Sequence, residues 1–598
     1  MTLFQAVIKQ DIQEIKKALA TGANINGTDA HGQSALMHAV AGNNPAIVKL
    51  LIDAGADVNA MGTVYGKWRQ PDHLRVLMFA RSTEIVKMLL DAGADVNLPN
   101  DEGKTPLMHA AQYHSTEVVK ALLDAGANPN AQNKFGSTPL IFAHRAAVVK
   151  LLIDAGADVN VANNLGICPL TMAQDRETAR LLLDAGALVN YGIEPSPLMQ
   201  AAKYHDAQFV RLLLEAEPDV NLPDSSGTTL LMCAAKYNKP DVVRLFIEKG
   251  ADLNAQDNCG YTALMRACTK KRSANVRVLL EAGADINRQN CNGHTALMLA
   301  VDQDDLETLR LLIAAGADVH LTESNGKTAL WHAVGWSSLP VIKALVDAGA
   351  DVNDKSRQDT LLHTATSSGR TEHVQALIDA GAEVNAKNAF DEPPLVKAVN
   401  EPTARALLAA GAEVTPEISL LLACRFGQTA QVKALLAKGA DANFATTLGT
   451  PLCEAANAPI ARALIVAGAD VNKRGKLGST PLTSVCLSIA ERAAKVLRVL
   501  LSAGADTEQR EGTFHWTPLM CAAFVNNPET VRLLIASGAD VNAKNEDGET
   551  ALSLTDDKEI EKMLKAAGAI DQGKPKGKSI SVQAKRPIRR CTYKGFRR

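Results

Sequence analysis

The sequence predicts an all-α repeat protein, a solenoid of about 18 helix-turn-helix units. The motif Gly-Ala-Asp-Val-Asn, or a near copy, recurs about once every 32 residues, and two short helical patterns lie between consecutive copies. A fixed period of this size is typical of a solenoid rather than of compact domains. The motif begins at Gly22, Gly55, Gly93, Gly126, Gly156, Gly186, Glu217, Gly250, Gly283, Gly316, Gly349, Gly381, Gly411, Gly439, Gly468, Gly504, Gly538 and Gly568.

The unit that ends at Gly126 shows how each helix is specified. Thr105 offers a capping hydroxyl, and Pro106 suits the first helical position, where its missing N–H costs nothing. A short apolar segment at 107–111 is followed by an amphipathic one at 117–124. The glycine ends this second helix, and an Asn/Asp/Gly-rich stretch then leads through a tight turn to the next unit.

A residue type that tolerates the left-handed backbone conformation separates the two helices of most units. We therefore expect this conformation at the turn. The residues at this position are Asn43, His114, His205, Asn238, Asp304, Gly369, Gly427 and Asn526.

These units resemble the ankyrin repeat, because TPLMHAA, VVKALLDAGANPN and GSTPL match its sequence pattern. The resemblance covers roughly residues 1–570 and implies paired antiparallel helices with projecting β-hairpin fingers. It also implies a surface that holds other proteins. The finger is largely missing near Gly411, so we expect a bend in the solenoid at 411–420.

Methionine replaces the histidine that the family usually has after Thr-Pro-Leu. One interpretation is a metal-binding or oxidation-sensitive series of methionines, and the other, which we favour, is adaptable filling of the core. Only His363 keeps the family's histidine, which in the family ties neighbouring turns together. The methionines are Met37, Met78, Met108, Met199, Met232, Met265, Met298 and Met520.

Charge is divided unevenly along the chain. Residues 572–598 carry ten Lys/Arg and no Asp/Glu, which leaves 53 basic and 65 acidic residues in 1–571. We expect residues 571–598 to be a disordered tail. It would contact nucleic acid, direct nuclear import, meet an acidic partner or membrane surface, or simply remain solvated. Its candidate electrostatic residues are Lys585, Arg586, Arg589, Arg590, Arg597 and Arg598.

No catalytic, cofactor or metal site is expected. The ten cysteines contain no Cys-x-x-Cys pair or His/Cys cluster. No histidine stands in a recognisable nucleophile motif, and no segment outside the repeats is long enough for an enzyme domain. The chain has no signal-peptide-like or membrane-spanning apolar run. We expect a cytoplasmic monomer, or a nuclear protein if the source is a eukaryote.

Aromatic residues recur at the last position of the first, inner helix. The chain is only 4% aromatic, so this repetition is an enrichment, and aromatic side chains commonly anchor protein interfaces. The alternative is that they pack on the neighbouring repeat. The residues are Tyr113, Tyr204, Tyr237, Trp336 and Phe426.

A second variable position precedes the first alanine of the inner helix. In the ankyrin fold it faces the concave groove, and Arg266 and His332 are our candidates there. Six repeats are three residues short within this helix and its turn. The six repeats from Leu198 to Gly381 are full length, so they offer the longest regular groove.

Two fingers are irregular. Residues 60–74 are about eight residues longer than a normal finger and display Tyr65, Trp68 and Arg69, which favours an interface over a loop that folds back on the solenoid. The finger with Trp516 is a weaker second candidate.

Three functions follow from these observations. The leading one is a non-enzymatic scaffold or adaptor that binds protein partners of unknown identity in the groove and on the fingers. The second is a nucleic-acid-associated regulator anchored by its basic tail. The third is an effector directed into a host cell.

Overall fold

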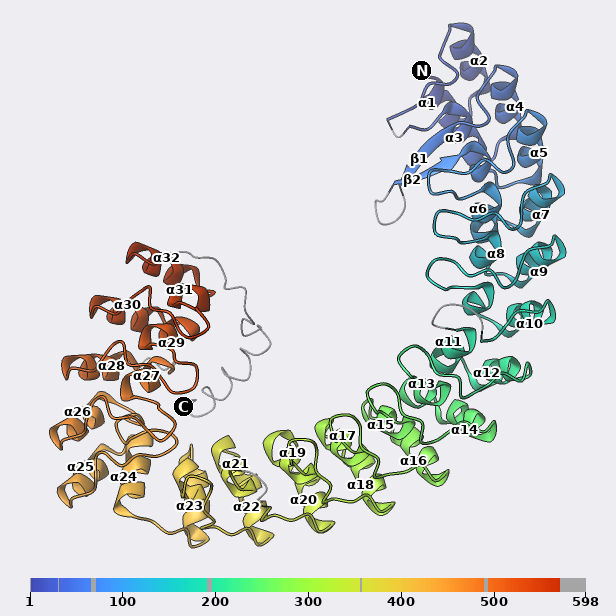
Figure 1. The fold of residues 1–598 in the computed structure, drawn as a ribbon. Coiled ribbons are helices and arrows are strands. Elements are labelled where there is room, and N and C mark those ends of the chain that lie inside the picture. Colours follow the sequence, from blue (N-terminus) through green and yellow to red (C-terminus); the bar gives the residue numbers. More distant parts are fainter. Residues whose placement is uncertain are drawn as a thin grey trace. The chain divides into compact units, whose positions relative to one another are not determined.

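The computed structural model consists of stacked helix pairs in two compact units, Met1–Cys291 and Asn292–Arg598 (Figure 1). The structure describes residues 2–30, 32–65, 71–190, 196–354, 358–488 and 493–570.

The first unit contains α1 (Leu3–Ile8), α2 (Ile12–Ala20), α3 (Ala35–Ala41), α4 (Pro45–Asp53), β1 (Met61–Tyr65), β2 (Pro71–Arg75), the 3-10 helix η1 (Val76–Phe79), α5 (Thr83–Asp91), α6 (Pro106–Tyr113), α7 (Thr116–Asp124), α8 (Pro139–Phe142), α9 (Ala146–Asp154), η2 (Pro169–Met172), α10 (Arg176–Asp184), α11 (Pro197–Tyr204), α12 (Ala207–Leu214), α13 (Leu230–Tyr237), α14 (Pro240–Glu248), α15 (Ala263–Cys268) and α16 (Ser273–Glu281).

The second unit contains α17 (Ala296–Asp302), α18 (Leu306–Ala314), α19 (Ala329–Trp336), α20 (Leu339–Asp347), α21 (Leu361–Ser368), α22 (Thr371–Asp379), η3 (Pro394–Lys397), α23 (Glu401–Ala409), α24 (Pro416–Arg425), α25 (Thr429–Ala437), α26 (Ala458–Val466), α27 (Pro481–Cys486), α28 (Ala493–Ser502), α29 (Pro518–Phe524), α30 (Pro528–Ala536), α31 (Ala551–Leu554) and α32 (Lys558–Ala566).

The predicted helix-turn-helix repeat is confirmed, and its local signals act as expected. The Thr105 side chain accepts a hydrogen bond from the Met108 N–H at the start of α6, where Pro106 is the first helical residue. In α7 the apolar stripe is buried, and Gly126 follows the helix with φ of 85°. An added Cβ on this glycine would meet no atom within 4 Å, so the backbone angle alone selects glycine there.

The six short repeats lack most of the first helix, as the sequence predicts. Four-residue helices stand in five of them, namely η1, α8, η2, η3 and α31. In the sixth, residues 451–454 form a turn. The second helices stay regular and have eight to ten residues each.

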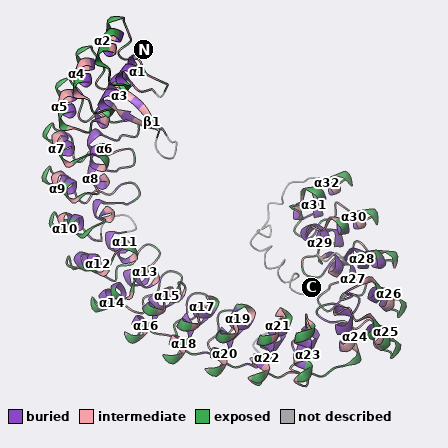
Figure 2. Cartoon of the chain, turned by 180° about the vertical axis from the view of Figure 1, so that it is seen from behind, coloured by how far each residue is buried: buried purple, intermediate pink, exposed green. Residues whose placement is uncertain are grey.

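The apolar sides of the two helix layers meet in a buried core in each unit, and the exposed residues lie mainly on the second helices and loops (Figure 2). The eight methionines after Thr-Pro-Leu or its equivalent are all buried, which supports the core-filling interpretation. The Met37 sulfur also accepts from the Ser34 N–H at 3.4 Å, so methionine replaces part of the family histidine's bonding within its own repeat.

The left-handed turn is only partly as predicted. Positive φ angles are found at Asn43, Asp304, Gly369, Gly427 and Asn526. At His114, His205 and Asn238 the prediction is wrong, because these residues are extended, with φ between −97° and −108°. The His114 and Asn238 side chains instead reach the preceding repeat, where they bond to the backbone carbonyls of Met78 and Ala202.

The fingers form a ladder along the stack. The Lys134 N–H donates to the Glu102 carbonyl of the preceding finger, and the Asn164 N–H donates to that of Phe135. The long finger at 60–74 differs, because β1 and β2 pair as an antiparallel hairpin from Met61↔Arg75 to Tyr65↔Pro71.

The asparagine of the recurring motif explains the repetition of that motif. Asn97 donates from Nδ2 to the Gly126 carbonyl of the next repeat at 3.1 Å, and its Oδ1 accepts from the Asn128 N–H at 2.8 Å. One side chain therefore fixes the spacing of two repeats. Both bonds are also made by Asn26, Asn59, Asn130, Asn160, Asn221, Asn353, Asn385, Asn443, Asn472 and Asn542.

We expect His320→Asn and Asn353→Ala to shift stability in opposite directions. His320 is exposed at the motif position where Asn353 of the next repeat makes both bonds. Gaining the bridge should raise the free energy of unfolding by about 1 kcal/mol, and losing it should lower this energy by about 1–2 kcal/mol. Urea denaturation followed by circular dichroism measures both. Shifts of the same sign would contradict the assigned role.

Candidate binding face

The fingers and the first helices lie on one side of each unit, and the second helices lie on the other (Figure 1). In the first unit α6, α8, α11 and α13 are on the finger side, and in the second unit α17, α19 and α21 are. We call the exposed surface of the first helices and of the fingers beside them the inner face. The candidate residues of the first helices and their ends contribute to it, namely Tyr113, Tyr204, Tyr237, Arg266, His332, Trp336 and Phe426.

Four of the five predicted aromatic residues are exposed on this face. The exposed fractions are 63% for Tyr113, 74% for Tyr204, 40% for Tyr237 and 69% for Trp336, whereas Phe426 is half-buried. Such exposure argues against the alternative that they serve mainly to pack on the next repeat. A large apolar side chain held in water on a rigid helix is available for a partner.

The exposed aromatics share a backbone setting. Each of the four ends its helix and is followed by an extended residue, Ser337 in the case of Trp336. The repeats with a left-handed turn at Asn43, Asp304 and Asn526 have no aromatic at the corresponding position. The exposed aromatics and the extended turn therefore occur together, whereas the half-buried Phe426 precedes the left-handed Gly427.

Cationic side chains lie against two of these rings. Lys104 Nζ is 5.1 Å from the centre of the Tyr113 ring, and Lys236 Nζ is 4.8 Å from that of Tyr237. The His109 ring lies 5.0 Å from Tyr113. Lys104 and His109 are themselves buried, and Lys104 also donates to Gln112, so these contacts hold the Tyr113 ring against its own helix.

Apolar finger tips are a further part of the inner face and were not among the residues predicted from the sequence. Phe135 and Leu165 stand immediately before the finger glycines of successive repeats, and both are exposed. Leu448 and Leu477 hold the same position in two successive fingers of the second unit. The recurrence of a large apolar residue immediately before a finger glycine is the sequence signal from which these finger tips could have been predicted.

The position before the first alanine is less open than expected. Arg266 is paired with the carboxylate of Asp257 in its own finger, with Nε 3.0 Å from Oδ2, and its guanidinium lies 4.2 Å from the Tyr261 ring. The same nine-residue spacing pairs His38 Nε2 with Asp29 at 2.8 Å. These bases tie the finger to the inner helix.

Some predicted residues are outside the described part of the chain. Tyr65 belongs to β1, and the structure describes its backbone but not its side chain. Trp68 and Arg69 lie outside the described residues, and so do the six basic residues selected in the tail. Their roles, the tail itself and the bend at 411–420 stay predictions.

The prediction that Trp516 is an interface residue on its finger is wrong. Its side chain is buried between Phe514 and Phe524, with ring centres 4.9 and 4.8 Å away. An indole enclosed by two rings is part of the core and is not available to a partner.

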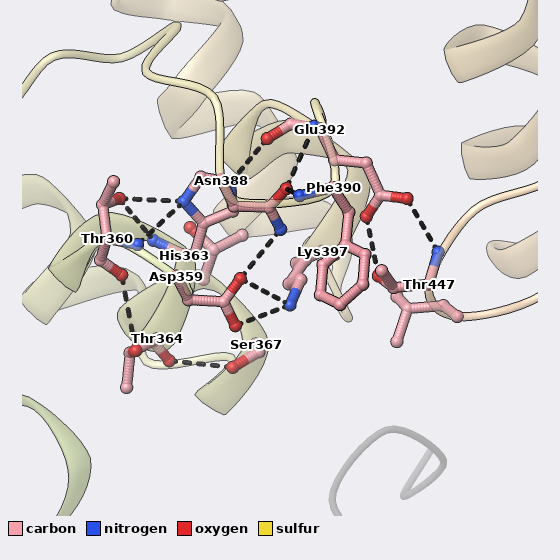
Figure 3. Close-up of polar contacts among 12 residues, drawn as sticks. Asp359, Thr360, His363, Thr364, Ser367, Asn388, Phe390, Glu392, Lys397 and Thr447 are labelled. Carbon is pink, nitrogen blue, oxygen red and sulfur yellow. Dashed lines mark hydrogen bonds and ion pairs between the residues drawn. The ribbon is translucent and has the colours of Figure 1, made fainter. Parts of the chain in front are cut away.

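The missing finger near Gly411 is bridged by a buried polar contact (Figure 3). The Glu392 carboxylate accepts hydrogen bonds from the Thr447 N–H at 2.7 Å and from the Thr447 hydroxyl at 2.6 Å. Lys476 Nζ lies 3.4 Å from the same carboxylate and donates to the Phe390 carbonyl. Fingers from non-consecutive repeats therefore meet where the intervening repeat has none.

His363 lies beside this contact and makes the bonds that the family resemblance implies (Figure 3). Its Nε2 donates to the Glu392 carbonyl of the next repeat at 2.8 Å, and its Nδ1 accepts from the Thr360 hydroxyl at 2.8 Å. Burial lowers the pKa of His363, which keeps the ring neutral. The neighbouring Asp359–Lys397 ion pair, at 2.7 Å, joins the same two repeats.

The chain belongs to the ankyrin-repeat family. The family model described as ankyrin repeats (3 copies) matches residues 1–62, 122–195, 198–290, 239–323, 287–356 and 420–511. The model described as ankyrin repeats (many copies) matches residues 89–143. The model for the single ankyrin repeat matches residues 76–101, 357–389 and 514–546. In the described residues, no helix is both long and apolar enough to span a bilayer.

Curated relatives match only in part. A putative palmitoyltransferase ZDHHC13 of Danio rerio is 32% identical over 136 residues, 22% of this chain and 21% of that protein. The human protein fem-1 homolog C is 41% identical over 70 residues, 12% of this chain and 11% of that protein. The chain thus spans about a fifth or less of these two relatives. The crystal structure of the Bcl-3 ankyrin repeat domain is 29% identical, covers 36% of this chain and 99% of that domain, and has a TM-score of 0.34.

Acid should destabilise the first unit through His109. Burial and the nearby His114, Lys104 and Arg81 lower the pKa of His109 to about 3. The unfolded chain therefore takes up this proton near pH 6.5 while the folded chain does not. The contribution of His109 to the free energy of unfolding is therefore fully present above that pH. Below it, the free energy of unfolding should fall by up to about 1.4 kcal/mol per pH unit.

Urea denaturation of the wild type and of His109→Gln at pH 7 and pH 5 measures this dependence. The other histidines titrate in both proteins, so the variant should lose less stability between the two pH values. Equal losses would show that His109 does not carry the effect.

Proposed function

We propose that the chain is a non-enzymatic adaptor that holds partner proteins on the inner face. The observation that carries this proposal is the exposure of Tyr113, Tyr204, Tyr237 and Trp336 at one position of four full-length repeats. Tyr204 and Tyr237 belong to consecutive repeats of the first unit and are followed by matching extended turns. Membership of the ankyrin-repeat family supports it, since such repeats are interaction modules.

A preformed surface suits this role energetically. The aromatics stand on short helices whose buried sides are fixed in the core, so little ordering is needed when a partner binds. Aromatic residues are enriched among the few interface positions that dominate binding energy. The finger tips Phe135 and Leu165 would extend the contact beyond the helices.

Tyr204→Ala with Tyr237→Ala should abolish partner capture while leaving the fold intact. Affinity purification and mass spectrometry with the wild type define the partners, and the variant should bind them at least about 30-fold more weakly, as expected for loss of a hot spot. The melting temperature should change little, because substitutions of exposed side chains usually alter stability by less than about 0.5 kcal/mol each.

Ile12→Ala with Leu188→Ala is the matched control. These two apolar residues are also exposed and belong to the same unit. Ile12 begins the second helix α2, and Leu188 lies in the loop after the second helix α10. The control should retain every partner. Equal loss in both double variants would contradict a specific role for the inner face, and a large fall in melting temperature of the tyrosine variant would support packing instead.

A second function is favoured by a separate observation, the ten basic residues of 572–598 against the excess of acidic residues before them. We propose that this segment contacts nucleic acid through phosphate neutralisation. Titration of the full chain and of a version ending at Asp571 with DNA and RNA at two salt concentrations tests it. Affinity that falls with salt and disappears on truncation supports the proposal, and equal affinity of both versions refutes it.

A further inference from the structure

Two imidazoles and a carboxylate converge in the second unit. His294 follows Gly293 in one finger, Glu323 lies in the next finger, and His332 lies on α19. His294 Nε2 is 2.7 Å from Glu323 Oε2, and His332 Nε2 is 3.9 Å from the same oxygen. One ligand atom from each residue lies within 4.8 Å of the other two. The side chains are 8–19% exposed.

A fourth residue orients this cluster. His332 Nδ1 lies 2.9 Å from Asp302 Oδ1, and because a carboxylate accepts, Nδ1 must carry the hydrogen. In the neutral ring, the lone pair is then on Nε2, the atom on the Glu323 side. This Nε2 is buried and has no hydrogen-bond partner among the described residues. Histidine ligands of metal ions are commonly held in this way, by a carboxylate on the other nitrogen.

We propose that His294, Glu323 and His332 bind one divalent transition-metal ion of the Zn²⁺ class, with Asp302 as the outer partner of His332. Two imidazoles and one carboxylate are a ligand set that zinc accepts, with a fourth position left for water. Bonds of about 2.0–2.1 Å in a tetrahedral site put ligand atoms about 3.4 Å apart. The present separations bracket this value, so small side-chain rotations suffice.

The charge of the cluster agrees with a cation. The Glu323 and Asp302 carboxylates place negative charge beside the two imidazoles. Nitrogen ligands select zinc-like ions over Mg²⁺ and Ca²⁺, which prefer oxygen alone.

Comparison with the His38–Asp29 pair shows how the His332–Glu323 pair differs from other finger-to-helix pairs. His38 and Asp29 have the same nine-residue spacing as His332 and Glu323. In the repeat before that of Glu323 and His332, His294 follows the finger glycine Gly293 and reaches Glu323. The second imidazole converts a finger-to-helix pair into a three-ligand set. No metal site is expected from the sequence, because these ligands come from two repeats and match no known motif.

Zinc titration of the metal-free, untagged full chain tests the proposal. Isothermal titration calorimetry should detect one high-affinity site, and Co²⁺ as a probe should give the intense visible absorption of tetrahedral coordination. His294→Ala and Glu323→Gln should each weaken zinc binding by at least about 100-fold, and Asp302→Asn by about 10–100-fold. His38→Ala, the matched control, should bind zinc like the wild type.

Zinc should also raise the melting temperature of the wild type and of His38→Ala but not that of Glu323→Gln. Glu323→Gln keeps the size of the side chain, so it tests the site even if His294→Ala unfolds. Circular dichroism without metal checks the fold of each variant. A wild type without a single tight site, or a folded Glu323→Gln that binds zinc as tightly as the wild type, would overturn the proposal.

Discussion

The whole structure depends on burial between consecutive repeats. A pair of helices of about nine residues each cannot enclose its own apolar side chains, so α6 and α7 bury theirs against the pairs before and after them. The polar contacts then fix how far apart the pairs stand. Asn97 and its counterparts set this spacing at the loops, and backbone hydrogen bonds such as that from Lys134 to Glu102 set it at the fingers. A rigid surface results, and its composition is free to vary.

The inner face uses that freedom in two ways. In some repeats the basic residue before the first alanine of the inner helix forms an ion pair with a carboxylate of the finger, as Arg266 does with Asp257. At others the helix ends in an exposed aromatic, as at Tyr204. The first arrangement stabilises the finger and the second offers a contact. The inner face therefore combines one repeat position that stabilises the finger with another that is available for binding.

The repeat could be predicted from sequence because its signals are local. Capping hydroxyls, the proline after them and the closing glycine fix each helix within a few residues, and the missing three residues correctly identify the short repeats. Features that depend on contacts between repeats could not be predicted in this way. Trp516 is buried because Phe514 and Phe524 enclose it, and His114 is extended because its side chain reaches Met78. The approach of His294 to Glu323, 29 residues away, has the same origin.

The contact of Glu392 with Thr447 has a consequence for how the second unit assembles. Most repeats touch only their neighbours, so such a stack can grow one repeat at a time from any starting point. Here partners are 55 residues apart for Glu392 and Thr447, and 86 apart for Phe390 and Lys476. The first contact forms only after η3 and helices α23 to α25 are in place, and the second also needs α26. Residues 388–479 are thus a cooperative block with a higher contact order than the rest, and this block should fold more slowly than the repeats that flank it.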